Sequence, residues 1–106
     1  MAAIFRIRGA DELMAMLRRS IKDFNLYRLE AQKAAYKTQT PHSRIDLSGQ
    51  IIENLCLDRI DLRDAMLMGT MFINCSIVKG RFDNASASRI VFRNCNLDGS
   101  TAEAEG

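Results

Sequence analysis

Apolar residues between Ile45 and Ala104 recur every five positions, a spacing that fits neither a strand nor a helix. A strand points every second side chain to one face, and a helix places residues three or four apart on one face. The residues at the centre of the successive fives are all apolar: Leu47, Ile52, Leu57, Leu62, Leu67, Phe72, Ile77, Phe82, Ala87, Phe92, Leu97 and Ala102. This period predicts a chain that turns a corner every five residues and points one side chain inward from each edge.

Four such edges make a square coil of twenty residues, and successive coils stack at the spacing of neighbouring strands, roughly 4.8 Å. Residues twenty positions apart then form columns in the core, such as Leu47, Leu67 and Ala87. Two of the four columns end in a small residue, at Ala87 and Ala102. Because each coil is buried by its neighbours, we expect the stability of every coil to depend on the next.

The pattern resembles the pentapeptide-repeat family, in which a central Leu or Phe follows a small residue two positions earlier. The second and third coils have such small residues, for example at Thr70, Cys75 and Gly80, whereas the first coil has larger ones, as at Ile45. The resemblance implies a mostly-β fold, a right-handed quadrilateral β-helix of about three coils. We assign this unit to residues 44–106.

Residues 1–43 are predicted to form a short strand, a helical cap and a linker. Alternating apolar residues indicate a strand over Ala3–Arg8. An apolar stripe at helical spacing contains Leu13, Leu17, Ile21 and Phe24. It predicts a helix of about fourteen residues with Asp11 as its N-cap. We expect Asn25 to loosen this helix before a second helical stretch, Leu26–Tyr36.

An open first coil would expose apolar side chains and unpaired backbone groups. An amphipathic helix laid over the coil would cover both, so we interpret the stripe as a cap. The alternative is a helix that mediates dimerisation.

Length and composition indicate one domain of a soluble protein, with 106 residues of which 47% are apolar and 26% charged. No apolar run is long enough to cross a membrane, and the N-terminal segment lacks the apolar core of a signal peptide. Cys75 and Cys95 fall at the same inward position and are predicted to stack as thiols, whereas Cys56 points outward. We therefore predict a cytoplasmic protein with no membrane contact.

Motifs for chemistry are missing from the sequence. The single histidine, His42, follows the only proline in a linker, without a nucleophile or orienting partner nearby in sequence. The cysteines do not have metal-ligand spacing, and no glycine-rich nucleotide loop occurs. We predict no catalytic residues, no metal, no cofactor and no enzymatic activity.

Outward positions should be polar on a soluble coil, but several on two adjoining sides are apolar. These residues are Ile51, Met66, Met68, Met71, Ile73 and Val91. Exposed apolar patches of a few hundred Å² usually mark interaction sites, and methionine suits adaptable surfaces. We predict that they bind a partner protein, although the N-terminal helices or a second copy of the chain are alternative coverings.

The last coil is followed by a segment too short for a capping helix, so its end is expected to stay open or to pair with a second copy. We predict a homodimer with Leu97, Ala102 and Phe92 in its interface. The apolar side or the N-terminal helices are alternative dimer surfaces.

Three functional hypotheses follow. The first is a non-enzymatic inhibitor or adaptor that occludes a partner protein with its apolar face. The second comes from the resemblance, because some pentapeptide-repeat proteins mimic DNA and modulate a topoisomerase such as DNA gyrase; a defence nuclease complex is a related target. Residues 41–106 have a net charge of only −2, from seven basic and nine acidic residues, which suits a DNA mimic poorly.

The third hypothesis is direct nucleic-acid binding by the basic N-terminal segment, which has eight basic and four acidic residues in positions 1–40. The basic residues are Arg6, Arg8, Arg18, Arg19, Lys22, Arg28, Lys33 and Lys37. Because acidic residues lie among them, the sequence favours a solvated helix face over a phosphate-binding surface.

Overall fold

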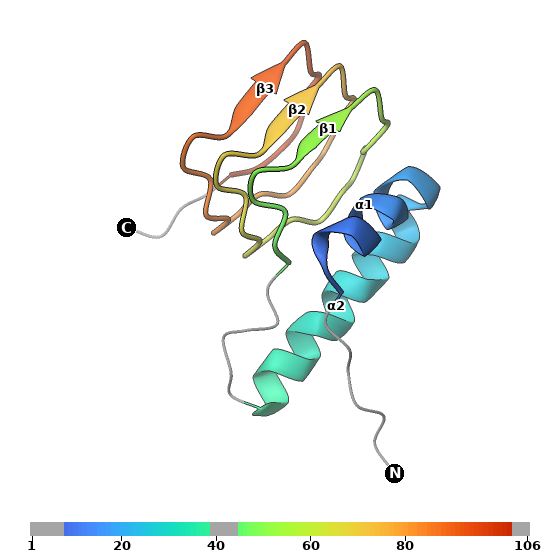
Figure 1. The fold of residues 1–106 in the computed structure, drawn as a ribbon, viewed down its shortest axis with the longest axis vertical. Helices are drawn as coiled ribbons and strands as arrows, with labels where there is room; N and C mark the ends of the chain where they lie inside the picture. The colour runs from blue at the N-terminus through green and yellow to red at the C-terminus, as the bar shows by residue number, and fades with distance from the viewer. Residues whose placement is uncertain (1–7, 39–44, 103–106) are drawn as a thin grey trace.

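The computed structural model describes residues 8–38 and 45–102, which form two helices followed by a small parallel sheet. The elements in chain order are α1 (Ala10–Arg19), α2 (Ile21–Thr38), β1 (Ile51–Glu53), β2 (Met71–Ile73) and β3 (Val91–Arg93). The strands lie side by side in the order β1-β2-β3, and both helices lie at the β1 end of the sheet (Figure 1).

Residues that pair between neighbouring segments are always twenty positions apart. Met71 pairs with Ile51 on one side and with Val91 on the other, and isolated bridges such as Cys56 with Ser76 keep the same spacing. The twenty-residue register predicted from the period is therefore confirmed. We call residues 45–64, 65–84 and 85–102 the first, second and third layers.

The predicted fold class, a mostly-β right-handed quadrilateral β-helix or solenoid, is wrong. Helices are the larger elements, with ten and eighteen residues, whereas each of the three strands has only three. The reason lies at the corners, where left-handed residues such as Asn54, Arg59 and Asp64 recur every five positions and interrupt the extended backbone. Only one side of each layer therefore pairs as a strand, and within residues 45–102 the other sides form single bridges.

Burial of the central residues falls toward the third layer. Leu47 and Leu67 are fully buried, but the third residue of their column, Ala87, is exposed. The three central phenylalanines pack together, with Phe72 stacked on Phe92 at 5.1 Å between ring centroids and Phe82 edge-on to both rings. The core is therefore closed at the first layer and open at the third.

The helices close the first layer with buried apolar side chains. Leu13, Met14 and Leu17 of α1 and Phe24 of α2 belong to the same hydrophobic cluster as Ile45, Leu47 and Ile52 of the first layer. Both helices therefore share one core with the layers. The predicted boundary at residues 43–44, the linker before it and most of the predicted strand Ala3–Arg8 lie outside the described residues.

The sequence predicts a helix break at Asn25, but the break occurs at Ser20. Ser20 has an extended conformation, its N–H donates to the carbonyl of Met16, and its hydroxyl accepts a 3.1 Å hydrogen bond from the N–H of Asp23. It therefore ends α1 and caps α2. The predicted N-cap is also wrong, because Gly9 holds that position and Asp11 lies in the first turn of α1.

Candidate protein-binding surfaces

The parallel sheet presents a column of apolar side chains to solvent. Ile51, Met71 and Val91 are aligned by strand pairing, and Ile51 and Val91 are 55% and 37% exposed. Met71 is half-buried between them, and Ile73 lies on the same strand face as Met71 because side chains alternate along a strand. These four residues form what we call the sheet face.

The two methionines predicted for the same patch lie on the neighbouring side of the second layer. Met68 is 46% exposed, whereas Met66 is half-buried and pairs with Asp46 and Ser86. Polar residues therefore flank Met66 in both adjacent layers. The apolar column continues through all three layers only on the sheet face.

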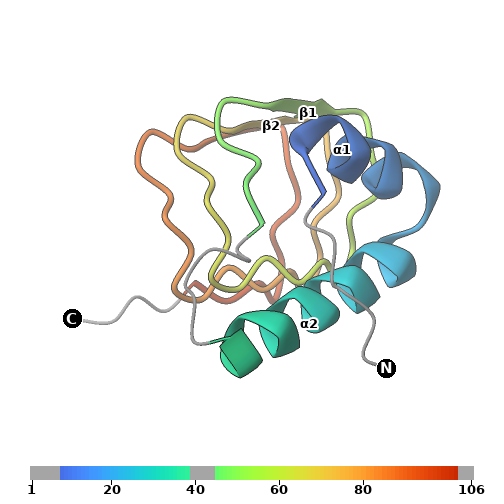
Figure 2. The same cartoon turned by 60° about the horizontal axis from the view of Figure 1, so that its bottom comes forward.

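The helices do not cover the sheet face. Helix α2 lies along the side of the layers opposite the strands (Figure 2), where it contacts the segment 59–64. The side-chain amide of Asn25 donates to the carbonyl of Arg59 at 3.0 Å and accepts from the N–H of Asp61 at 2.8 Å. Ile51, Met68 and Val91 of the predicted patch remain exposed, so the described helices do not fold over it as that alternative required.

Arg28 also joins α2 to the first layer, through hydrogen bonds and ion pairs. Its side chain is only 4% exposed and donates two hydrogen bonds, of 3.1 and 3.3 Å, to the carbonyl of Arg63. Its guanidinium lies 3.4 Å from a carboxylate oxygen of both Asp61 and Asp64, and it bonds Gln32 at 2.8 Å. This arginine is therefore unavailable to the basic nucleic-acid-binding surface considered from the sequence.

Arg28, Asp61, Arg63 and Asp64 form a charged cluster. Within it, burial and neighbouring charges shift the pKa of Arg28 and of Asp61. Burial lowers the pKa of Arg28, and the attraction of Asp61 opposes that effect. Burial alone would raise the pKa of Asp61, but hydrogen bonds from the side chain and backbone of Arg63, together with the charge of Arg28, outweigh it and lower that pKa. Asp61 is therefore held ionised, and the cluster has a structural role in docking α2.

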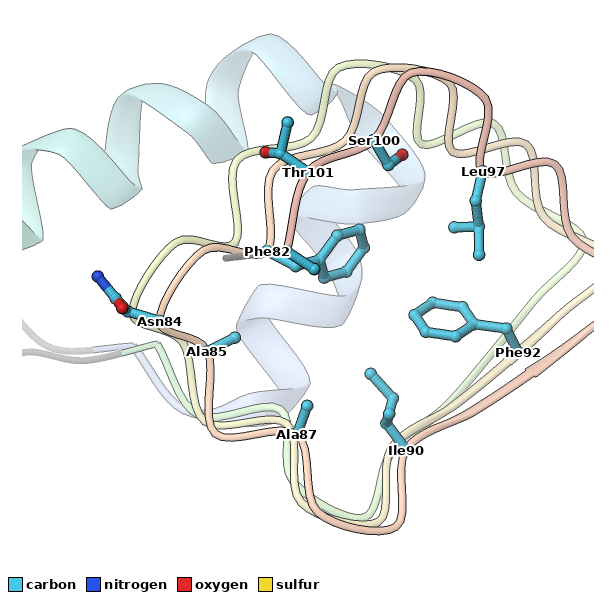
Figure 3. A pocket seen from close by; sticks show the side chains of 10 residues that line it. Phe82, Asn84, Ala85, Ala87, Ile90, Phe92, Leu97, Ser100 and Thr101 are labelled. Carbon is cyan, nitrogen blue, oxygen red and sulfur yellow. The ribbon is translucent and has the colours of Figure 1, made fainter. Parts of the chain in front are cut away.

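A hollow of about 390 Å³ opens at the exposed surface of the third layer, which we call the open end. Its lining residues are Phe82, Asn84, Ala85, Ala87, Ile90, Phe92, Leu97, Ser100, Thr101 and Ala102. The rings of Phe82 and Phe92 and the side chain of Leu97 point into it (Figure 3). All three residues predicted for a dimer interface, Phe92, Leu97 and Ala102, therefore line the same hollow.

Asp58 links the first and second layers through hydrogen bonds. Asp58 accepts hydrogen bonds from the Ser76 hydroxyl at 2.6 Å and the Val78 N–H at 2.9 Å, and these bonds lower its pKa. All three cysteines are free thiols; Cys56 is exposed, and burial raises the pKa of Cys75. Among residues 8–38 and 45–102, no three His, Cys, Asp or Glu side chains are grouped to hold a metal. His42 lies outside the described residues.

In the described part of the chain, neither helix combines the length and apolar character needed to cross a bilayer.

No family model matches the chain, and no curated protein matches it. The resemblance to pentapeptide-repeat proteins therefore stays a prediction that depends on the five-residue pattern alone.

The sequence pattern missed the two residues that dock α2. Arg28 looked like one of several solvated cations, and Asn25 looked like a helix breaker. A usable signal was the spacing of Phe24, Arg28 and Ala31, which places a cation on the buried helix face beside apolar residues.

Proposed function

We propose that this protein is a non-enzymatic binding module that occludes part of a partner protein with its sheet face. The observation that supports the proposal is the aligned column Ile51, Met71 and Val91, in which Ile51 and Val91 are exposed although the helices bury the first layer elsewhere. An apolar column of this kind suits an inhibitor or an adaptor. The three free thiols are compatible with a reducing compartment, and we place the protein in the cytoplasm.

The backbone beneath the sheet face suits this role because it is held at short intervals. Each layer bonds to the next on all four sides, for example from Leu67 to Ser86 and from Ile77 to Asn96. A surface held in one conformation loses little entropy on docking. Met71, at the centre of the column, has an unbranched side chain that can adapt to its partner.

The partner should present an apolar surface with charges at its edge. Ile73 lies between Glu53 of β1 and Arg93 of β3 in the strand pairing, and both charged residues are exposed. Opposite charges on the partner would fix its orientation across the strands, whereas burial of the apolar column would supply most of the affinity.

Capture of partners from a cell lysate with a Met71→Asp variant as the comparison tests the proposal. The new carboxylate would be buried in the interface, so we expect partner recovery to fall at least about tenfold. Asn96→Asp is the matched control, because Asn96 is exposed on a different side of the layers. The side-chain oxygen of Asn96 accepts a hydrogen bond from the N–H of Asp98, and the carboxylate of the variant can accept the same bond. Equal recovery with both variants, each folded by circular dichroism, would refute the proposal.

The predicted homodimer remains a separate proposal, tested by the mass in solution. Light scattering should give twice the 11.9 kDa of the chain if two copies pair.

The charges on the first layer do not favour a DNA-mimic function. Asp61 and Asp64 lie against Arg28, and Asp61 also pairs with Arg63 at 2.9 Å. Carboxylates that are neutralised in this way do not form the uniform row of negative charge that a mimic of the DNA backbone needs. We therefore do not propose this function further.

A further inference from the structure

The open end combines a hollow with an unpaired backbone edge. In the second layer, the N–H groups of Leu67, Ile77 and Phe82 donate to carbonyls of the third layer at 2.7–2.8 Å. The equivalent groups of the third layer belong to Ala87, Leu97 and Ala102. Within the described residues, which end at Ala102, these N–H groups have no acceptor.

Such an edge favours pairing with another extended segment. Unpaired N–H and C=O groups on a sheet edge are a template for strand addition, in which main-chain hydrogen bonds give affinity and side-chain pockets give specificity. Strand β3 supplies the regular part of this edge (Figure 1).

The hollow exists because the third layer has alanine where the layers below have large residues. Ala87 follows Leu47 and Leu67, and Ala102 follows Leu62 and Phe82, so the space above Leu67 and Phe82 is not filled. Its lining contains no charged side chain, and aromatic and aliphatic groups surround it. The hollow therefore suits a large neutral side chain, aromatic or branched.

This shape argues against the open end of a second copy as the occupant. Two open ends that face each other would bring hollow against hollow and leave the space over Ala87 and Ala102 empty. Stable interfaces pack as densely as protein interiors. An incoming segment that supplies a protruding side chain meets this requirement, and a flat or concave surface does not.

The charges beside β3 define the rest of the segment. Arg93 is exposed and forms no ion pair with another described residue, whereas Val91, also exposed, is apolar. A paired segment places neighbours beside both residues and one inward side chain beside Phe92. An apolar neighbour for Val91 and an acidic neighbour for Arg93 complete the match.

We propose that the open end binds an extended peptide segment of a partner protein by strand addition to β3. The segment has three consecutive residues: an apolar residue beside Val91, a large apolar residue that fills the hollow over Phe92, and an acidic residue beside Arg93. This inference does not depend on the proposed function, because it requires the free edge of β3 and the hollow; of the sheet face, the segment would lie beside Val91 alone.

The test is a titration of the full isotope-labelled chain with the capped peptide acetyl-Thr-Ser-Ile-Phe-Glu-Ser-Thr-amide, followed by amide NMR. We expect saturable shifts at the N–H groups of Ala87, Phe92 and Leu97, with a Kd on the order of 0.1–1 mM. A peptide with Ser in place of Phe is the ligand control and should bind at least about tenfold more weakly.

Two variants locate the binding site. Ala87→Leu fills the hollow and should raise the Kd at least about tenfold, and Ala102→Leu should act in the same way if the first variant does not fold. Ala15→Leu, at an exposed position of α1, is the matched control and should leave the Kd unchanged.

The remaining outcomes overturn the proposal. Absence of saturable shifts up to about 5 mM peptide would exclude strand addition of useful strength. Equal binding of the Phe and Ser peptides would show that the hollow is not used. An unchanged Kd for the Phe peptide with the Ala87→Leu and Ala102→Leu proteins would show the same. Shifts at the same amides on raising the protein concentration alone would identify a second copy as the occupant.

Discussion

Arg28 of α2 lies 3.4 Å from the carboxylate of Asp61 in the first layer, although the two residues are thirty-three positions apart in the sequence. The arginine is almost fully buried, so the pair fixes the position of α2 on the layers. Asn25, one helical turn earlier, bonds the backbone on both sides of Ile60. Side chains of α2 thus satisfy an edge of the first layer that would otherwise be unpaired.

Replacing Arg28 with Met should destabilise the protein by about 2–4 kcal/mol, because Asp61 would lose a buried partner and the Arg63 carbonyl would lose two donors. Urea unfolding measures this difference. Arg19→Met is the control, since the Arg19–Asp23 pair is 3.8 Å long and exposed, and it should cost less than about 0.5 kcal/mol. Similar losses for the two variants would contradict the structural role of Arg28.

Acid should weaken the folded state in part through Asp61. Its pKa is lower in the folded chain than the usual value of about 3.9, so its contribution is complete above that value and is lost as the pH falls through the folded pKa. Asp61→Asn should therefore flatten the dependence of unfolding free energy on pH below about pH 4. Urea midpoints measured from pH 2 to 6 test this; parallel curves for both proteins would be inconsistent with it.

Substitution of Gly80 by Ala should cost about 1–3 kcal/mol through overpacking. An added Cβ would lie 2.7 Å from Cγ2 of Ile77 and 3.1 Å from a ring carbon of Phe82. Thermal unfolding followed by circular dichroism measures the loss. Ser88→Ala, at an exposed site of the third layer, is the control, because it changes a side chain that lies at the surface. If Gly80→Ala were as stable as that control, the close packing at this corner would be wrong.

Loss of the Ser20 hydroxyl should weaken the start of α2. Ser20→Ala removes the acceptor for the Asp23 N–H and should cost about 1 kcal/mol. Amide hydrogen exchange in the first turn of α2 should become faster in this variant. Ser88→Ala, at an exposed site of the third layer, controls for the change of residue type. Unchanged exchange at Asp23 would show that the cap contributes nothing.

The five-residue period was sufficient to predict which residues stack and that the central residues of the first two layers are buried. Leu47, Leu67 and Phe72 are fully buried, and their partners lie twenty residues apart. The period could not predict how much of each side pairs as a strand, since that depends on how far the left-handed corners interrupt the backbone. The fold class was wrong for this reason, and because the two helices contribute more regular structure than the strands.

The candidate surfaces were predictable to different degrees. Alternation along the chain identified Ile51, Met71 and Val91, because an outward apolar residue is visible in a repeat of known register. The hollow was only hinted at by Ala87 and Ala102, since its size depends on how the neighbouring rings pack. The position of α2 was not predictable, because it depends on contacts of Asn25 and Arg28 with segments more than thirty residues away.

The fall in burial from the first layer to the third makes the protein unequal in local stability along its axis. Among residues 8–38 and 45–102, the first layer is covered on both sides, whereas Phe92, Leu97 and Ala102 have a neighbouring layer on only one. In a chain whose layers support only their neighbours, opening starts at the least supported end and spreads inward. A molecule that covers this end would slow unfolding, so its binding would lengthen the lifetime of the whole fold.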